Sequence, residues 1–142
     1  MKNWKAAFPE MLPPRTTSYY VRVCDGDEGL VVELYSETVK VVLDFGITVA
    51  TRIFEETTVE ADIHGNGIDQ AITDEKAQHV VYELKDANFK REVQQLMGDL
   101  WEIVEDPRHY AIYTNNYIVE VISRGEPEIE VGQITSSKAI DS

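Results

Sequence analysis

The chain contains one cysteine, few basic residues and no long apolar run. Its sole cysteine, Cys24, has no partner for an internal disulfide, which favours a reducing compartment such as the cytoplasm. The first residues lack the continuous apolar stretch of a signal peptide. No segment approaches the roughly 18 uncharged apolar residues that a membrane-spanning helix needs. We therefore expect a cytoplasmic protein that does not enter a membrane.

Basic residues are outnumbered two to one. The sequence has 13 lysines and arginines against 26 aspartates and glutamates, for a formal net charge of −13. Affinity for phosphates depends on lysine and arginine, so this balance argues against nucleic acid and anionic membrane surfaces as partners. A strongly negative surface keeps a protein soluble. It can also steer a basic protein toward it, and the composition leaves both interpretations open.

Motifs that carry chemistry are also missing. There is no nucleophile elbow, phosphate loop or dinucleotide fingerprint, so no cofactor is expected. The three histidines, His64, His79 and His109, lack zinc-ligand spacing, and no cysteine pair accompanies them. Cys24 precedes Asp25, whose charge disfavours a reactive thiolate. These absences favour a non-catalytic protein without a metal, although they leave its status as an enzyme uncertain.

What is present indicates one globular domain. A chain of 142 residues with 43% hydrophobic residues is long enough to bury a core without a metal or disulfide. The punctuated segment PEMLPP separates an N-terminal arm, residues 1–17, from a domain over residues 18–131. The polar residues 132–142 form a C-terminal tail. The oligomeric state is not indicated.

Alternating apolar residues predict an antiparallel β-rich first half. Tyr19, Val21 and Val23 share one strand face, and a turn follows at residues 25–29. A strand is then expected over LVVELY. In VKVVLDF, Val39, Val41, Leu43 and Phe45 share one face. Gly46 separates this run from ITVATRIF, and the short turns suggest a meander.

One helix is predicted after Asn88, which is a plausible N-cap. Gly98 indicates where this helix could stop. Six apolar residues form a stripe along the helix at spacings of three and four. They are Phe89, Val93, Leu96, Met97, Leu100 and Val104. Residues 74–85 fit either a helix or a strand, and the Val-Val-Tyr content favours a strand. The expected fold class is α+β, a mainly antiparallel sheet of about six to eight strands packed by one or two helices.

The expected core gathers apolar residues from the strands and the helix. Its members are Val41, Leu43, Phe45, Phe89, Val93, Leu96, Leu100, Ile112, Val119 and Val121.

The segment YAIYTNNYIVEVIS predicts a β-hairpin that turns at Asn115-Asn116. In that register both faces of the hairpin are largely apolar, as expected of a sheet covered on both sides. The register also makes His109 and Glu120 diagonal neighbours on one face. They could form an acid–base pair, but no third group is apparent, so a buried histidine satisfied by an acid is the favoured interpretation.

The loop Asp62–Asp69 superficially matches a calcium-binding loop. Asp62, Asn66 and Gly67 fit its pattern, but His64 occupies a ligand position and Thr73 stands where a bidentate glutamate is expected. A glycine-rich turn is the favoured interpretation.

The lead hypothesis is a small binding or inhibitor protein that resembles an immunity protein in role and neutralises a basic protein partner. It predicts acidic residues clustered on one surface, and the candidates are Asp25, Asp27, Glu28, Glu126, Glu128 and Glu130. One alternative is an enzyme or metal-binding protein that uses His109 with Glu120, or His64 with Asp62 and Asp69. Another is a subunit of a larger assembly, built through an apolar sheet face.

Overall fold

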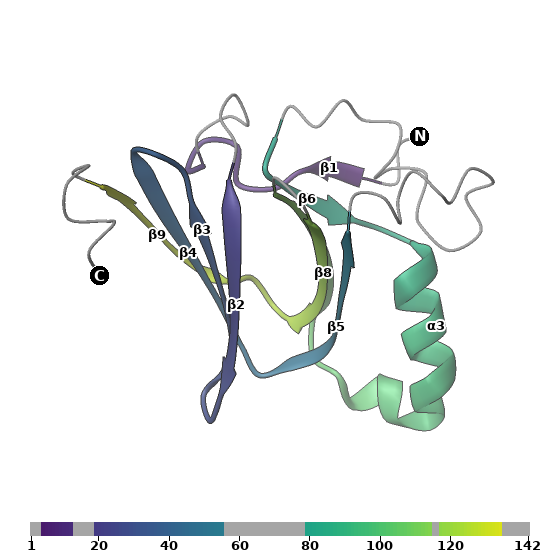
Figure 1. The fold of residues 1–142 in the computed structure, drawn as a ribbon. Coiled ribbons are helices and arrows are strands. Elements are labelled where there is room, and N and C mark those ends of the chain that lie inside the picture. Colours follow the sequence, from purple (N-terminus) through teal and green to yellow (C-terminus); the bar gives the residue numbers. More distant parts are fainter. Residues whose placement is uncertain (1–3, 13–18, 56–78, 115–116, 135–142) are drawn as a thin grey trace.

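Two antiparallel sheets form the body of the molecule. The structure is a computed structural model that describes residues 4–12, 19–55, 79–114 and 117–134 (Figure 1). Sheet A has the strand order β1-β6-β7-β8-β5, formed by Trp4–Ala6, Val81–Leu84, Pro107–Tyr113, Tyr117–Arg124 and Thr48–Glu55. Sheet B has the order β2-β3-β4-β9, formed by Tyr20–Gly26, Gly29–Tyr35, Val39–Gly46 and Glu128–Gln133.

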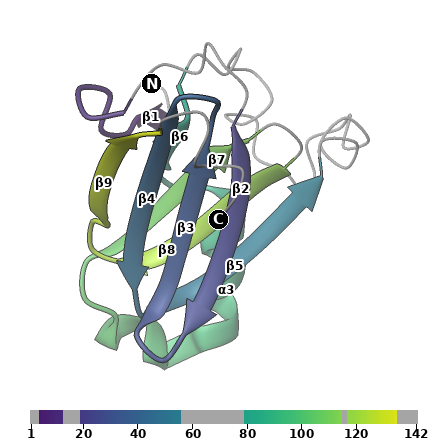
Figure 2. The same ribbon diagram turned by 60° about the vertical axis from the view of Figure 1, so that its left-hand side comes forward.

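The two sheets stack face to face, and helical segments cover the other side of sheet A (Figure 2). These segments are helix α3, Asn88–Met97, and the 3₁₀ helix η1, Gly98–Ile103. The α+β class is confirmed, with a mostly antiparallel strand content and one short α-helix. The single sheet of six to eight strands was wrong, because nine strands in the described residues divide between two sheets.

The strands of sheet B follow the predicted alternation. Val41, Leu43 and Phe45 are buried against sheet A, while Asp44 points to solvent. Tyr19 is buried and Val21 packs on the same core. Burying every second side chain removes one apolar face from water, which is the main favourable contribution to folding. The residues that the sequence placed on this face are confirmed there.

The predicted meander holds for β2, β3 and β4 and then ends. After β4 the chain turns at Gly46, whose φ is 67°, and β5 joins sheet A beside β8. Strand β9 later returns to sheet B and pairs with β4. Alternation along a strand reveals which side chains are buried, but it does not reveal which sheet the strand joins.

The β7–β8 hairpin has the predicted register. His109 pairs with Ile122, Tyr110 with Val121, and β7 is the central strand of sheet A. One face of the hairpin, including Tyr110, contributes to the core between the sheets. The other face lies under α3 and neighbouring side chains. The two apolar faces therefore reflect a sheet covered on both sides.

The helix departs from prediction in two ways. It begins after Ala87 as N-cap, with no side-chain cap, rather than after Asn88. It ends at Gly98 as expected, with a φ of 55°. Beyond that residue the chain is 3₁₀-helical, which changes the direction of the following side chains. Leu96 and Leu100 were predicted in the core and are exposed instead, because Val93, Met97 and Trp101 face the sheet and leave them on the other side of the helical segments.

The structure decides between helix and strand for part of residues 74–85. Val81–Leu84 form strand β6, as the Val-Val-Tyr content favoured, whereas residues 74–78 lie outside the described part of the chain. The N-terminal arm contributes an unpredicted strand, β1, beside β6, and the Trp4 ring meets that of Tyr82 edge to face. Within the described residues, no helix has both the length and the apolar character to cross a membrane.

Candidate functional site

The hairpin register joins His109 and Glu120 under helix α3. His109 Nε2 lies 2.7 Å from Glu120 Oε1, and both side chains are completely buried. A carboxylate can only accept, so Nε2 carries the proton of this hydrogen bond. The other ring nitrogen, Nδ1, has no hydrogen-bond partner among the described residues. The predicted proximity of the two side chains is confirmed.

Arg52 completes the arrangement from the edge strand β5. Its Nε donates to Glu120 Oε2 at 2.6 Å. The guanidinium lies over the rings of Phe54 and Phe89, 4.6 and 4.4 Å from their centroids. Glu92 of α3 approaches the same guanidinium at 3.9 Å. Glu120 therefore has a cation on one oxygen and an imidazole on the other, which offsets the cost of burying its charge.

This network, His109, Glu120 and Arg52, is built for structure rather than turnover. General acid–base catalysis needs a group that can reach a proton of the substrate. The carboxylate and imidazole are sealed beneath Phe89 and the surrounding sheet. Both oxygens of Glu120 already accept hydrogen bonds. The geometry therefore supports a role in fixing α3 and β5 onto the hairpin.

The second candidate site, the loop Asp62–Asp69, cannot be located in the structure. His64, Asp62 and Asp69 belong to residues 56–78, which lie outside the described part of the chain. Within the ranges that are described, no cluster of three or more histidine, cysteine, aspartate or glutamate side chains could hold a metal ion. Cys24 lies half-buried on β2.

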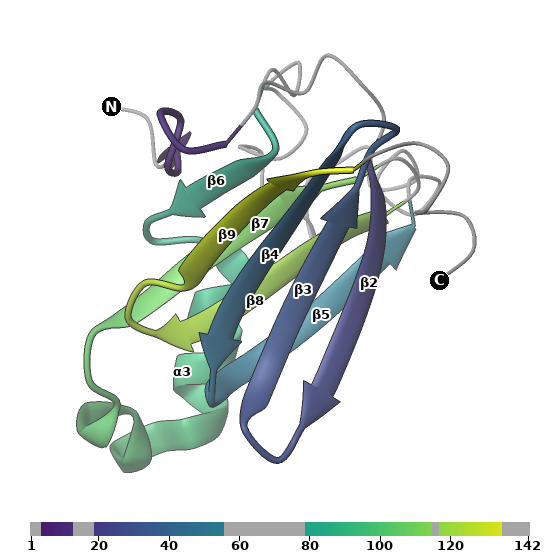
Figure 3. The ribbon, with the colours of Figure 1, turned by 90° about the vertical axis from the view of Figure 1, so that its left-hand side faces the viewer.

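Four chain connections gather at one end of the sandwich (Figure 3). They are the β2–β3 turn, the β4–β5 link, the segment between η1 and β7, and the β8–β9 link. The pairings of Leu30 with Gly46, Asp44 with Glu128, and Pro107 with Arg124 fix them there. This end carries many exposed acids, and we call it the acidic end; its members are Asp25, Asp27, Glu28, Asp44, Glu105, Asp106, Glu126 and Glu128.

Five of the six predicted acidic residues belong to the acidic end. The sixth, Glu130, lies two residues beyond Glu128 on β9 and pairs with Val42 of β4. Asp44, Glu105 and Asp106 were not among the predicted candidates. Asp44 faces outward from a strand and could have been found from its alternation with Leu43 and Phe45.

Few bases counter these acids. In the described residues of the acidic end, the basic side chains are Arg108 and Arg124. Arg108 donates to Asp106 and Glu83 at 3.1 Å and lies 3.8 Å from Glu126. The hydrogen bond to Asp106 is the largest cause that raises the pKa of Arg108 above its ordinary value. Asp106 and Glu126 are thus partly compensated, while Asp27 and Glu28 project from the turn.

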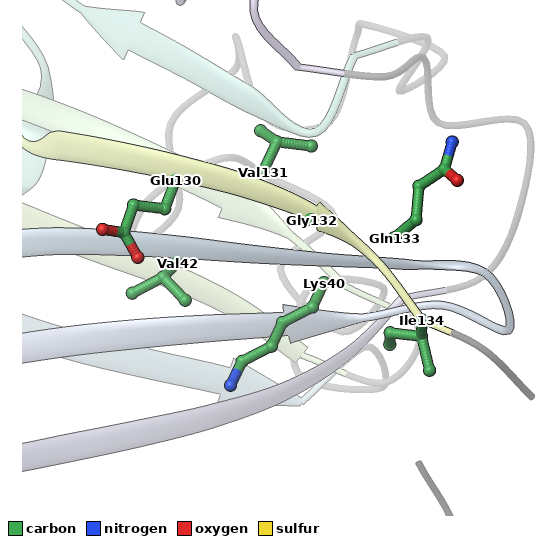
Figure 4. Close-up of a pocket in the computed structure, with 7 residues that line it drawn as sticks. All are labelled: Lys40, Val42, Glu130, Val131, Gly132, Gln133 and Ile134. Carbon is green, nitrogen blue, oxygen red and sulfur yellow. The ribbon is translucent and has the colours of Figure 1, made fainter. Parts of the chain in front are cut away.

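An open hollow of about 480 Å³ lies along β4 and β9 on sheet B (Figure 4). Lys40 and Glu130 line it from the two strands. The lysine is already engaged: its ammonium lies 3.8 Å from Glu33 and 5.4 Å from the ring centroid of Tyr35. The hollow is shallow and its polar groups do not converge, unlike a typical small-molecule site.

Helices α3 and η1 expose three large apolar side chains, which we call the apolar ridge. Leu96, Leu100 and Ile103 are 86%, 61% and 70% exposed. The residues next to them in sequence, Met97 and Trp101, pack toward the sheet. The spacing of four and three residues keeps the ridge on the opposite side. Leu96 and Leu100 were predicted to lie in the core, and Ile103 was not predicted.

The comparisons with protein families, curated proteins and solved structures find no match to this chain.

Proposed function

We propose that this chain is a non-catalytic binding protein that docks a basic protein partner at its acidic end. The observation that supports the proposal is the convergence of acids from three separate connections, and from the strand ends beside them, on one end of the sandwich. Asp25, Asp27 and Glu28 come from one hairpin, and Glu126 and Glu128 arrive from a connection about 100 residues later in the chain. A compact negative surface raises the rate at which a positively charged protein meets it.

Inhibition of a basic partner is the role in which this surface is most useful. A protein that binds nucleic acid presents lysines and arginines on its working face. An acidic protein that covers that face blocks access by occupying the same charges. The buried network of His109 and Glu120 then serves to hold the scaffold, and the exposed acids provide recognition.

The test uses charge reversal at two ends of the molecule. The partner is captured from host lysate at low salt and identified, and its binding to purified wild-type protein is measured by biolayer interferometry. We expect Asp27→Lys with Glu28→Lys to slow association by about tenfold at low ionic strength. The matched control, Glu10→Lys with Glu37→Lys, reverses two exposed acids away from the acidic end.

Three results are expected from these measurements. The captured protein must be basic, the control must bind nearly as fast as wild type, and added salt must slow association. An acidic partner, or equal association rates for the two double variants, would contradict it.

A further inference from the structure

The side chains of the apolar ridge are exposed and do not contribute to the buried core. Leu96, Leu100 and Ile103 occur at helical spacing but turn away from sheet A, while Phe89, Val93 and Met97 contact it. A single exposed leucine is ordinary in a soluble protein. Three large apolar residues on one side of a 16-residue helical unit, residues 88–103, are typical of a surface that another molecule covers.

The charge around the apolar ridge indicates what could cover it. From Gln94 to Asp106 the chain contains no lysine, arginine or histidine. In the same interval Asp99, Glu102 and Glu105 are exposed beside the ridge residues. An apolar strip whose charged neighbours in this interval are all acidic favours a partner whose apolar side chains are bordered by bases.

We propose that the apolar ridge is the anchor for a polypeptide segment that presents apolar side chains flanked by lysine or arginine. This inference rests on the proposed function and names the chemistry of the partner's contact. Helix η1 leads directly through Glu105 and Asp106 into the acidic end (Figure 1). The two surfaces are therefore continuous along the chain, and one partner can use both.

A second copy of this chain is the competing occupant. Docking two apolar ridges would bring Asp99, Glu102 and Glu105 of each copy together, in a protein whose formal charge is already −13. Like charges placed opposite one another oppose association. Charge complementarity thus selects a basic segment over self-association.

The apolar ridge and the acidic end should contribute differently to binding. Apolar anchors near the centre of a contact contribute most of the affinity, and charges at its rim control encounter and selectivity. Removal of one ridge side chain should therefore accelerate dissociation. Reversal of an acid should instead slow association and change its salt dependence.

The experiment uses defined peptides as probes. The first is a leucine–lysine amphipathic helix of about four turns, and the second has the same leucines with glutamate in place of lysine. Binding to the full chain is measured by isothermal titration calorimetry, and the contact is mapped by amide chemical shifts. We expect the leucine–lysine peptide to bind and to shift amides of residues 94–106, and the leucine–glutamate peptide to remain unbound.

Matched variants locate the contact. Leu100→Ser and Met11→Ser each remove one exposed apolar side chain, 61% and 54% exposed in the wild type. Because neither side chain is buried, both variants should unfold at the wild-type urea midpoint. We expect Leu100→Ser to weaken binding of the leucine–lysine peptide by about tenfold and Met11→Ser to leave it unchanged.

Several results would overturn the inference. They are equal affinity of Leu100→Ser and wild type for the leucine–lysine peptide, no binding of that peptide, and equal binding of both peptides. A wild-type dimer in sedimentation velocity that Leu100→Ser abolishes would assign the ridge to a second copy. If the captured partner loses affinity on reversal of Asp27 and Glu28 but not with Leu100→Ser, the ridge fails while the proposed function stands. The opposite pattern would retain the ridge and reject the acidic end.

Discussion

The Nε of Arg52 lies 2.6 Å from Oε2 of Glu120, and it supplies the positive charge that the buried carboxylate requires. The arginine side chain is mostly buried at the sheet edge, and the glutamate is wholly buried inside. Breaking a buried ion pair from one side leaves an uncompensated charge, which costs more than the intact pair contributes. This asymmetry gives the first prediction.

Arg52→Met should lower the free energy of unfolding by about 3–5 kcal/mol, because it leaves the buried Glu120 carboxyl without the arginine that pairs with it. The measurement is urea unfolding followed by circular dichroism. Glu92→Gln is the matched control: its carboxylate lies 3.9 Å from the same guanidinium but is 59% exposed. We expect the control to change the free energy of unfolding by less than about 1 kcal/mol.

A double substitution separates charge from packing. Arg52→Met combined with Glu120→Met removes both charges, so it should recover much of the stability lost in Arg52→Met alone. His109 would then lose its partner, which limits the recovery. If the double variant is less stable than the single variant by a further several kcal/mol, the charge-based account is wrong and packing of the arginine stem dominates.

Tyr110→Phe should raise stability at alkaline pH. Tyr110 is wholly buried between the sheets, and its hydroxyl has no hydrogen-bond partner among the described residues. Burial raises the pKa of this phenol above its ordinary value near 10. The folded state thus holds the proton more tightly than the unfolded state, so stability is fully present below pH 10 and is lost as pH rises above it.

The measurement is urea unfolding of wild type and Tyr110→Phe at pH 8 and at about pH 11. At pH 8 we expect a small change, since removing an unsatisfied hydroxyl is neutral or stabilising. At the higher pH the variant should lose less stability than wild type. Parallel losses in both proteins would show that Tyr110 does not govern the alkaline response.

Gly29→Ala should destabilise the protein strongly. Gly29 has a φ of 110°, and a Cβ at this position would lie 2.1 Å from the carbonyl carbon and oxygen of Gly46. The backbone must therefore shift, in addition to adopting a conformation that alanine disfavours. We expect a loss of at least about 2 kcal/mol in urea unfolding. Gly132→Ala, which meets nothing within 4 Å and lacks a positive φ, should change stability by less than about 1 kcal/mol.

Val93→Ala and Leu96→Ala should differ although the residues are three apart on one helix. Val93 is 6% exposed and packs with Phe89 and Ile122, whereas Leu96 is 86% exposed. We expect Val93→Ala to cost about 1–3 kcal/mol in urea unfolding and Leu96→Ala to be nearly neutral. Equal losses would mean that the sheet, rather than solvent, faces Leu96.

Sequence patterns succeeded wherever the physical cause was local. The period of two placed Val41, Leu43 and Phe45 inside, and the hairpin pattern predicted the register that joins His109 to Glu120; the expected turn residues 115–116 lie outside the described residues. Both depend on neighbours along the chain. Arg52 was missed because its partner lies 68 residues away and no local pattern announces that pairing. A buried glutamate does imply a cation, but several bases could have supplied it.

The helix shows where a local pattern misleads. A stripe from Phe89 to Val104 predicts burial of all its residues, yet Phe89, Val93 and Val104 are buried whereas Leu96 and Leu100 are exposed. Gly98 then interrupts the regular helix, and the following 3₁₀ geometry places Leu100 and Ile103 in solvent. The pattern reports which residues are apolar on one side. It does not report whether the protein or a partner covers them.

Strand β9 gives the molecule an unusual order of assembly. Val39 on β4 pairs with Gln133, 94 positions later (133 − 39), whereas β3 and β4 meet across a short turn. Closing so long a loop is slow compared with forming a local hairpin. During synthesis β4 therefore remains an open edge until the ribosome has made the last described residues. The outward charges of Lys40 and Asp44 protect that edge from pairing with other nascent chains in the interval.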